Sequence, residues 1–273
     1  MRLLFIGDVV GRCGRSIVDD VLPGLIRDHS IDFVVLNGEN AAGGFGVTED
    51  IHQGFLNAGV DVVTTGNHVW DQREALEFCT RHDTFLRPAN YAHGAPGKGS
   101  GVFMARNGAR VMVMNVMGQV FMHPTLEDPF ACVERELSAC VLGEHVDAVV
   151  IDMHAEATSE KICLGHHVDS RASLVVGTHT HVPTSDYQIL DGGTGYMSDA
   201  GMTGDYGGSL GMMKEAPLQK FITKLPGERM EVGPGPATLC GVAVDTDDTT
   251  GLAVAIEPVR IGPRLKGHLP SFW

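Results

Sequence analysis

The stretch Phe33-Val34-Val35-Leu36-Asn37-Gly38-Glu39-Asn40 is a short apolar run that stops abruptly at a cluster of polar residues. A run of this length that contains β-branched residues is typical of a strand buried on both faces. The same pattern occurs where Leu3–Ile6 precedes Gly7-Asp8, and again where Val60–Thr65 precedes Gly66-Asn67-His68. We therefore expect three buried strands, each followed by a polar turn.

Two stretches between these strands have the spacing of apolar residues that is typical of helices. They are Ile17–Ile26 and Thr48–Ala58, and the second is bounded by Thr48 as N-cap and Gly59 as C-cap. Strands that alternate with helices predict a layered α/β domain.

The rest of the chain contains more strand signals than helix signals. Asn107-Gly108, between the apolar stretches Val102–Ala105 and Arg110–Val116, predicts a hairpin. A helix is expected over Pro129–Val141, followed by strands over Ala148–Met153 and Leu174–Gly177.

The C-terminal third predicts a second, mostly antiparallel sheet, because its apolar runs are joined by Gly- and Asp-rich turns. These runs are Gln188–Leu190, Tyr196–Ser198, Leu239–Asp245 and Leu252–Val259. Without a clear linker or repeat, residues 1–273 are interpreted as a single domain with an inserted excursion around Arg87–Gly101.

The composition is that of an ordinary soluble globular protein, with 43% hydrophobic and 20% charged residues. The net charge is −14 and no basic cluster occurs, so duplex nucleic acid is not an expected partner. A small phosphorylated substrate remains compatible with this charge, because bound metal cations would reverse the local field. The six cysteines form no paired motif, so we expect reduced thiols. The apolar run Leu3–Ile6 is too short for a signal peptide or membrane span, so we expect a cytoplasmic protein without a membrane partner.

Every predicted strand of the α/β part ends in residues that can bind a metal. They are Asp8, Glu39-Asn40, Asn67-His68, Asp152 with His154, and His179 with His181. Ligands of open α/β sheets gather at the carboxyl ends of strands, so we expect these residues at one edge of one sheet. Carboxylates and imidazoles without thiolates favour manganese, iron or zinc.

Simpler explanations exist for several of these residues. Asp8 could cap the following helix, and Asn40 and Asn67 could supply turns. A lone His154 could be a hydrogen-bonded core histidine.

Two features are harder to explain by structure alone. Glu39 follows the apolar run Val34–Leu36, so its carboxylate is expected to be nearly buried and to need a cation or a partner. His179 and His181 are two residues apart, and both can turn toward one site as they leave a strand.

Together these blocks resemble the calcineurin-like metallophosphoesterases. The blocks are Gly7-Asp8, Asn37-Gly38-Glu39-Asn40, Gly66-Asn67-His68, Asp152-Met153-His154 and Gly177-Thr178-His179-Thr180-His181. Gly7–Gly11 and Asn37–Gly44 further resemble the bacterial YmdB-like branch, described as 2′,3′-cyclic-nucleotide phosphodiesterases. The resemblance implies a layered α/β sandwich with central β-sheets flanked by helices and a metal site at the carboxyl ends of the strands.

The resemblance also implies a ligand set for two metal ions, with iron first and manganese or zinc as alternatives. The first ion would be held by Asp8, Glu39 and His181, and the second by Glu39, Asn40, Asn67, His154 and His179. Two departures from the broad superfamily are shared with the branch. Val10 stands where the superfamily has a histidine, and the bridging residue is Glu39 instead of an aspartate.

His68 is the expected proton donor. Two close cations would activate a water and hold the phosphoryl oxygens, and the leaving oxygen then needs a proton. His68 lies beside Asn67, and the resemblance gives it the same role, although it could instead only orient Asn67.

Three other features have open interpretations. Gly43–Gly46 is expected at the mouth of the site or as a plain turn, and Gly201–Met213 as a plain loop, a cover of the site or a subunit contact. Lys161 is expected at the solvated surface unless it meets phosphate.

The expected activity is hydrolysis of a small phosphodiester, such as a 2′,3′-cyclic nucleotide. Alternatives are a phosphomonoesterase with the same metal core, and a regulatory protein that binds metal and nucleotide but turns over slowly. The sequence leaves a homo-oligomer open.

Overall fold

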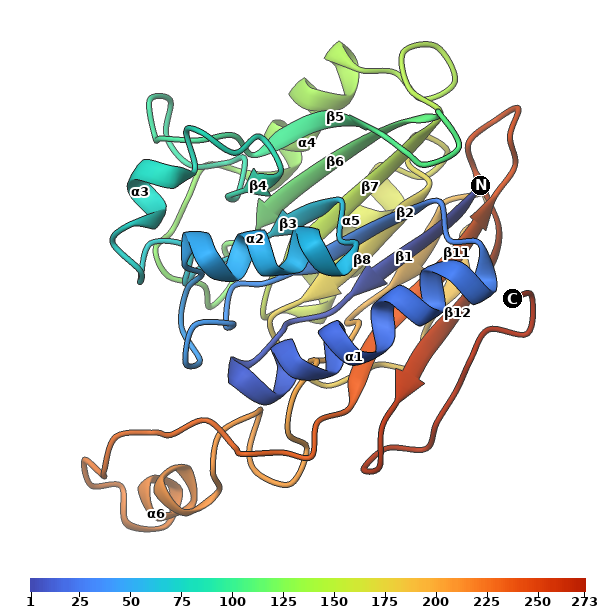
Figure 1. Cartoon of the computed structure of the whole chain (residues 1–273). Coiled ribbons are helices and arrows are strands. Elements are labelled where there is room, and N and C mark those ends of the chain that lie inside the picture. The colour runs from blue at the N-terminus through green and yellow to red at the C-terminus, as the bar shows by residue number, and fades with distance from the viewer.

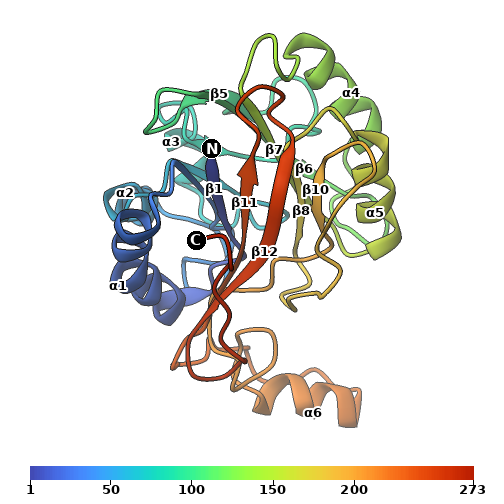
Figure 2. The same ribbon diagram turned by 90° about the vertical axis from the view of Figure 1, so that its right-hand side faces the viewer.

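The computed structural model describes residues 1–273 and has four layers, helix–sheet–sheet–helix (Figures 1 and 2). The first sheet has the order β12-β11-β1-β2-β3-β4 and the second the order β5-β6-β7-β8-β10-β9. The first sheet consists of β1 (Arg2–Ile6), β2 (Phe33–Asn37), β3 (Val62–Thr64), β4 (Phe85–Leu86), β11 (Leu239–Thr246) and β12 (Ala253–Ile261). The second consists of β5 (Ser100–Met104), β6 (Arg110–Met117), β7 (Ala148–His154), β8 (Leu174–Thr178), β9 (Gln188–Ile189) and β10 (Gly195–Met197). The α/β sandwich expected from the sequence is therefore confirmed.

Helices cover the outer face of each sheet. In Figure 2, α1 and α2 lie on one side of the sandwich and α4 and α5 on the other. The helices are α1 (Gly11–His29), α2 (Glu49–Ala58), α3 (Ala75–Phe78), α4 (Pro129–Ala139), α5 (Thr158–His167) and α6 (Glu215–Thr223). None of them is long and apolar enough to cross a membrane.

The alternation of side chains along β1 explains why the sheets are buried on both faces. Leu3 and Phe5 belong to the cluster between the two sheets, and Leu4 and Ile6 belong to the cluster under α1 and α2. Successive side chains of a strand point to opposite faces, so an uninterrupted apolar run fills two cores at once.

The boundaries of α2 follow the predicted caps. The hydroxyl of Thr48 accepts a hydrogen bond from the backbone N–H of Ile51 at 3.2 Å, and Gly59 ends the helix with φ of 105°. Helix α1 is longer than expected at both ends, since it starts at Gly11 and ends at His29.

The prediction of a separate antiparallel sheet in the C-terminal third is wrong. β11 and β12 extend the first sheet, where Val244 pairs with Leu3 of β1, and β9 and β10 extend the second. The reason is packing between the sheets, because Val242 and Val244 of β11 join the same inter-sheet core as Leu3 and Phe5 of β1.

The carboxyl ends of the parallel strands meet at one end of the sandwich. β1, β2 and β3 are mutually parallel in the first sheet, and β6, β7 and β8 are parallel in the second. The polar residues after β1, β2, β3, β7 and β8 therefore face one another across the two sheets. The expectation of a site on one sheet is wrong in this respect, because both sheets contribute.

Candidate metal centre

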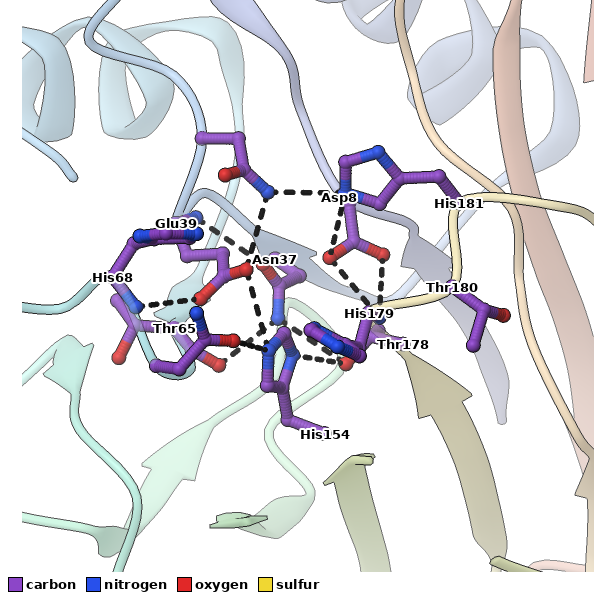
Figure 3. Close-up of polar contacts among 12 residues, drawn as sticks. Asp8, Asn37, Glu39, Thr65, His68, His154, Thr178, His179, Thr180 and His181 are labelled. Carbon is purple, nitrogen blue, oxygen red and sulfur yellow. Dashed lines mark hydrogen bonds and ion pairs between the residues drawn. The ribbon is translucent and has the colours of Figure 1, made fainter. Parts of the chain in front are cut away.

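The residues predicted from the strand ends gather in one cluster. Figure 3 shows this cluster, with Asp8, Glu39 and His181 among its labelled residues. Asp8, Glu39 and His154 are at most 1% exposed. Asp8 does not cap α1, because the N-cap is Val10 and the carboxylate instead accepts the backbone N–H of His179 at 3.2 and 3.3 Å. The capping explanation for Asp8 is therefore excluded.

Glu39 lies at the centre of the cluster. Its Oε1 is 3.3 Å from Nε2 of His154, and its Oε2 accepts the backbone N–H of His68 at 3.1 Å. Glu39, His154 and His179 each present a ligand atom, and these atoms lie within 4.8 Å of one another. One carboxylate and two imidazoles at this spacing can hold a transition-metal ion.

Asp8 and His181 form a neighbouring group beside Glu39. Nε2 of His181 is 3.8 Å from Oδ1 of Asp8 and 3.1 Å from Nδ2 of Asn40. Asn40 also donates to Oε1 of Glu39 at 3.2 Å, so it lies between the two groups. Rotation of this amide by half a turn would present its oxygen without changing the shape of the side chain.

Hydrogen bonds to Nδ1, the ring nitrogen that does not face Glu39, hold the ring of His154 in place. Its Nδ1 is 2.9 Å from the hydroxyl of Thr178, which donates to Asp152 at 2.6 Å. The buried Asp152 also accepts from Asn37 at 2.9 Å. This chain leaves Nε2 directed at Glu39, while Asn67 Oδ1 lies 2.9 Å from the same nitrogen. His154 is thus buried and hydrogen-bonded, as a core histidine would be, but its second nitrogen faces the cluster.

The buried acidic and basic side chains of the cluster shift one another's pKa values. Burial would raise the pKa of Glu39, but His154 and the backbone N–H of His68 outweigh it and hold that pKa below its usual range. Burial opposes charging of His154, yet Glu39 and Asp8 raise its pKa to about 9. Burial, offset in part by His181, raises the pKa of Asp8 to about 7. The raised pKa favours the protonated form of His154 beside the buried Glu39 carboxylate, at the position where a cation would balance the same charge.

His179, the second imidazole of the group formed with Glu39 and His154, stays neutral near pH 7. Burial, together with the neighbouring His154, lowers the pKa of His179 to about 3. A neutral imidazole is the form that binds metals.

Gly66 keeps the space at the centre of the cluster open. A Cβ at this position would overlap Nε2 of His154 and Oε2 of Glu39. The residue before Asn67 must therefore lack a side chain for these two groups to approach each other.

The loop that carries His179 and His181 is held in an unusual backbone conformation. Both residues have positive φ, 93° and 64°, which is uncommon outside glycine. Thr180 between them donates its N–H and its hydroxyl to Oδ2 of Asp199, at 3.1 and 2.6 Å. The same oxygen accepts from Lys161 at 2.9 Å. The surface location expected for Lys161 is wrong, because its side chain and that of Asp199 are each 1% exposed.

His68 lines a cavity of about 380 Å³ beside the cluster. Its Nδ1 is 2.8 Å from Oδ2 of Asp71, and its ring packs edge-on against Phe45 at 5.0 Å. Both glycine-rich segments reach this cavity, since Gly44 and Met212 line it. A larger cavity of about 770 Å³, between the start of α1 and residues 232–237, contains none of the clustered side chains.

Several residues of the site were not identified as such from the sequence. Asn37, Thr178 and Asp71 could have been suggested by their position in the sequence, because each lies within three residues of a predicted site residue. Asp199 and Lys161 carry no such signal, since their pairing depends on contact between α5 and the segment after β10.

Comparison with known proteins identifies close relatives over almost the whole chain. The family model described as YmdB-like protein matches residues 4–259. The 2′,3′-cyclic-nucleotide 2′-phosphodiesterase of Bacillus subtilis is 46% identical over 261 residues, which are 96% of this chain and 97% of that protein.

Two solved structures share the fold. The structure of a hypothetical protein from Thermus thermophilus matches with a TM-score of 0.88 and 41% identity. The match covers 96% of this chain and 99% of that chain. A structure described as a novel phosphatase from Mycoplasma pneumoniae also has a TM-score of 0.88, at 31% identity, and covers 96% of this chain and 93% of its own.

The buried pair of Lys161 and Asp199 gives a testable consequence for stability. Asp199→Asn leaves the Lys161 ammonium buried without its counter-charge, so we expect a loss of about 3–5 kcal/mol in the free energy of unfolding. The double variant Lys161→Met/Asp199→Asn should recover part of that loss, because no isolated charge remains. Urea denaturation measures both, with the exposed Glu134→Gln as the control. A cost of less than about 1 kcal/mol for Asp199→Asn, as for a surface ion pair, would contradict the assignment.

Proposed function

The chain belongs to the YmdB-like family, and from this premise we propose that it is a metal-dependent phosphodiesterase that hydrolyses 2′,3′-cyclic nucleotides. The observation that carries the proposal is the cluster of Asp8, Glu39, His154, His179 and His181 at the end of the sandwich. Its two carboxylates and His154 are buried, and the other two imidazoles are partly exposed. Carboxylates and imidazoles at such spacing, beside an open cavity, suit metal-assisted hydrolysis of a phosphate ester.

We assign the metal ligands to two overlapping sets. Asp8, Glu39 and His181 would hold the first ion, and Glu39, Asn40, Asn67, His154 and His179 would hold the second. The position of Glu39 supports its role as the bridge, because its Oε1 contacts His154 of the second set and also Asn40. The amide of Asn40 in turn lies 3.1 Å from Nε2 of His181, which belongs to the first set. Iron is the proposed metal, with manganese or zinc as alternatives that the same donors accept.

The protein's own groups prepare this site before any metal binds. Two bound cations supply an activated water and neutralise the phosphoryl oxygens. Thr178 and Asp152 fix the ring of His154, and Leu210 fixes that of His181 through a contact of 3.1 Å from its carbonyl oxygen to Nδ1. Such partners orient ligand imidazoles and keep the metal-binding nitrogen directed inward.

His68 is the proposed general acid. Asp71 engages Nδ1 of the ring at 2.8 Å, so Nε2 is the nitrogen left to give a proton to a substrate in the cavity. The backbone N–H of His68 contacts Glu39, which places the ring next to the cluster without making it a ligand. A carboxylate that holds the opposite nitrogen is the usual way to fix the orientation of a catalytic imidazole.

A phosphomonoesterase is the second candidate, and one finding favours it. The Mycoplasma pneumoniae structure that shares this fold is described as a phosphatase. A panel that pairs 2′,3′-cyclic AMP with adenosine 3′-phosphate separates the two activities, because only a diesterase consumes the first and leaves the second.

Glu39→Gln tests the proposed bridge. The substitution keeps the size of the side chain and removes the charge that would hold two cations together, so we expect loss of both metal and activity. Elemental analysis after reconstitution with manganese, beside turnover of bis-(p-nitrophenyl) phosphate, measures the two together. Glu134→Gln removes the same charge at the surface and should change neither. A Glu39→Gln variant that keeps two ions and normal turnover would show that Glu39 is not the bridge.

His68→Ala separates proton donation from metal binding. We expect unchanged metal content and a loss of turnover of about a hundred- to ten-thousand-fold on 2′,3′-cyclic AMP, because a ribose oxygen leaves poorly without a proton. The nitrophenyl diester should be much less affected, since p-nitrophenolate leaves readily on its own. Asp71→Asn should also lower turnover more on 2′,3′-cyclic AMP than on the nitrophenyl diester, but by less than His68→Ala does.

Two results would contradict the role of His68. Equal losses on the two substrates with full metal content would indicate that the ring positions the substrate. Loss of a metal ion would indicate that His68 supports Asn67 instead.

A further inference from the structure

Residues 214–230 form an arm that contains α6 and stands apart from the layers of the sandwich (Figures 1 and 2). The arm leaves and returns through a neck, in which residues 211–213 pair with residues 231–233. Met213 N donates to Glu231 O at 2.8 Å, and Gly233 N donates to Gly211 O at 2.8 Å. The neck therefore fixes where the arm begins and ends.

The neck is attached to the candidate metal centre. The carbonyl oxygen of Leu210, next to the neck, contacts Nδ1 of His181 at 3.1 Å. On the other side Met212 packs so closely on Gly44 that a Cβ there would be 2.8 Å from the methionine methyl. The arm is thus placed over the cavity by contacts to the same loops that carry the site.

The cavity has two chemically different walls. One is the polar cluster with Glu39 and His68, and the other is apolar. The apolar side chains are Phe45, Leu210, Met212, Pro217, Phe221 and Met230. Lys220 is the one lysine or arginine among the lining residues, so the arm also brings a cation to a substrate with a negative charge.

Phe221 is the most exposed of the large apolar residues of the arm, which also include Leu218, Ile222, Leu225 and Met230. Its side chain is 71% exposed although it lines the cavity, so its ring offers an open face next to the catalytic cluster. Exposed aromatic rings are costly to keep unless something covers them, and flat aromatic ligands cover them well.

We propose that the arm is the nucleobase-binding element of the enzyme, with Phe221 as the surface on which the base of the substrate stacks. The inference rests on the proposed function, because it takes the substrate phosphate to lie at Glu39 and His68 and the attached base to extend toward the apolar wall. Stacking is available to every base, so the arm selects nucleotides over simple phosphodiesters and discriminates little among the four bases.

The test is Phe221→Ala in the full-length protein reconstituted with manganese. The two substrates are 2′,3′-cyclic AMP and methyl β-D-ribofuranoside 2,3-cyclic phosphate, which lacks only the base. We expect KM for the nucleotide to rise roughly 5- to 150-fold, the range that loss of one base–aromatic stack produces. KM for the base-free substrate and kcat for both should stay unchanged, because the proposed stack involves only the base.

Ile222→Ala is the matched control. Ile222 is 67% exposed on the same helix but does not line the cavity, so its removal should change neither KM. Equal effects of Phe221→Ala on both substrates, or an equal effect of Ile222→Ala, would overturn the inference. So would a wild-type enzyme with the same KM for the two substrates.

A binding measurement keeps this inference distinct from the proposed function. Calorimetric titration of adenosine 3′-phosphate and of ribose 3-phosphate needs no turnover. If the wild type binds the nucleotide more tightly than the sugar phosphate, and Phe221→Ala removes this difference, the role of the arm is supported. This holds even if the wild type hydrolyses no diester, in which case only the proposed function fails. Equal binding of the two ligands by the wild type overturns the inference.

Discussion

The negative charge buried at Asp8 and Glu39 is the constraint on which the rest of the site depends. Two carboxylates that are almost inaccessible to solvent cannot both stay ionised without nearby positive charge. Glu39 and Asp8 raise the pKa of His154 to about 9, so a protonated His154 would supply part of that charge. Metal cations at the same place would satisfy both carboxylates, and this is the physical basis of the proposed enzyme.

The scaffold keeps these charged groups from moving apart. Two sheets packed face to face bring the ends of β1 and β2 opposite those of β7 and β8, and apolar clusters hold the sheets on both faces. The buried pair of Lys161 and Asp199 then anchors the loop that presents His179 and His181. The site is thus preorganised by packing and by a second charge pair, which lowers the cost of bringing its ligands together.

Much of this arrangement could be predicted from the sequence, because it is local. An apolar strand that ends in Asp8 or in Glu39-Asn40 is visible in the residues themselves, and so are the caps of α2 at Thr48 and Gly59. Pairing across long separations is not local, so the sequence does not predict that β11 and β12 join the first sheet or that Lys161 is buried. The sequence does not predict helix α5, whose N-cap residue, Ala157, makes no side-chain cap.

The most direct test of the account is anomalous X-ray scattering from crystals of the protein reconstituted with manganese. The account predicts two peaks, one beside Asp8 and His181 and one beside His154 and His179, with the carboxylate of Glu39 between them. One peak alone, or peaks away from Glu39, would contradict the central claim that this carboxylate joins two metal ions.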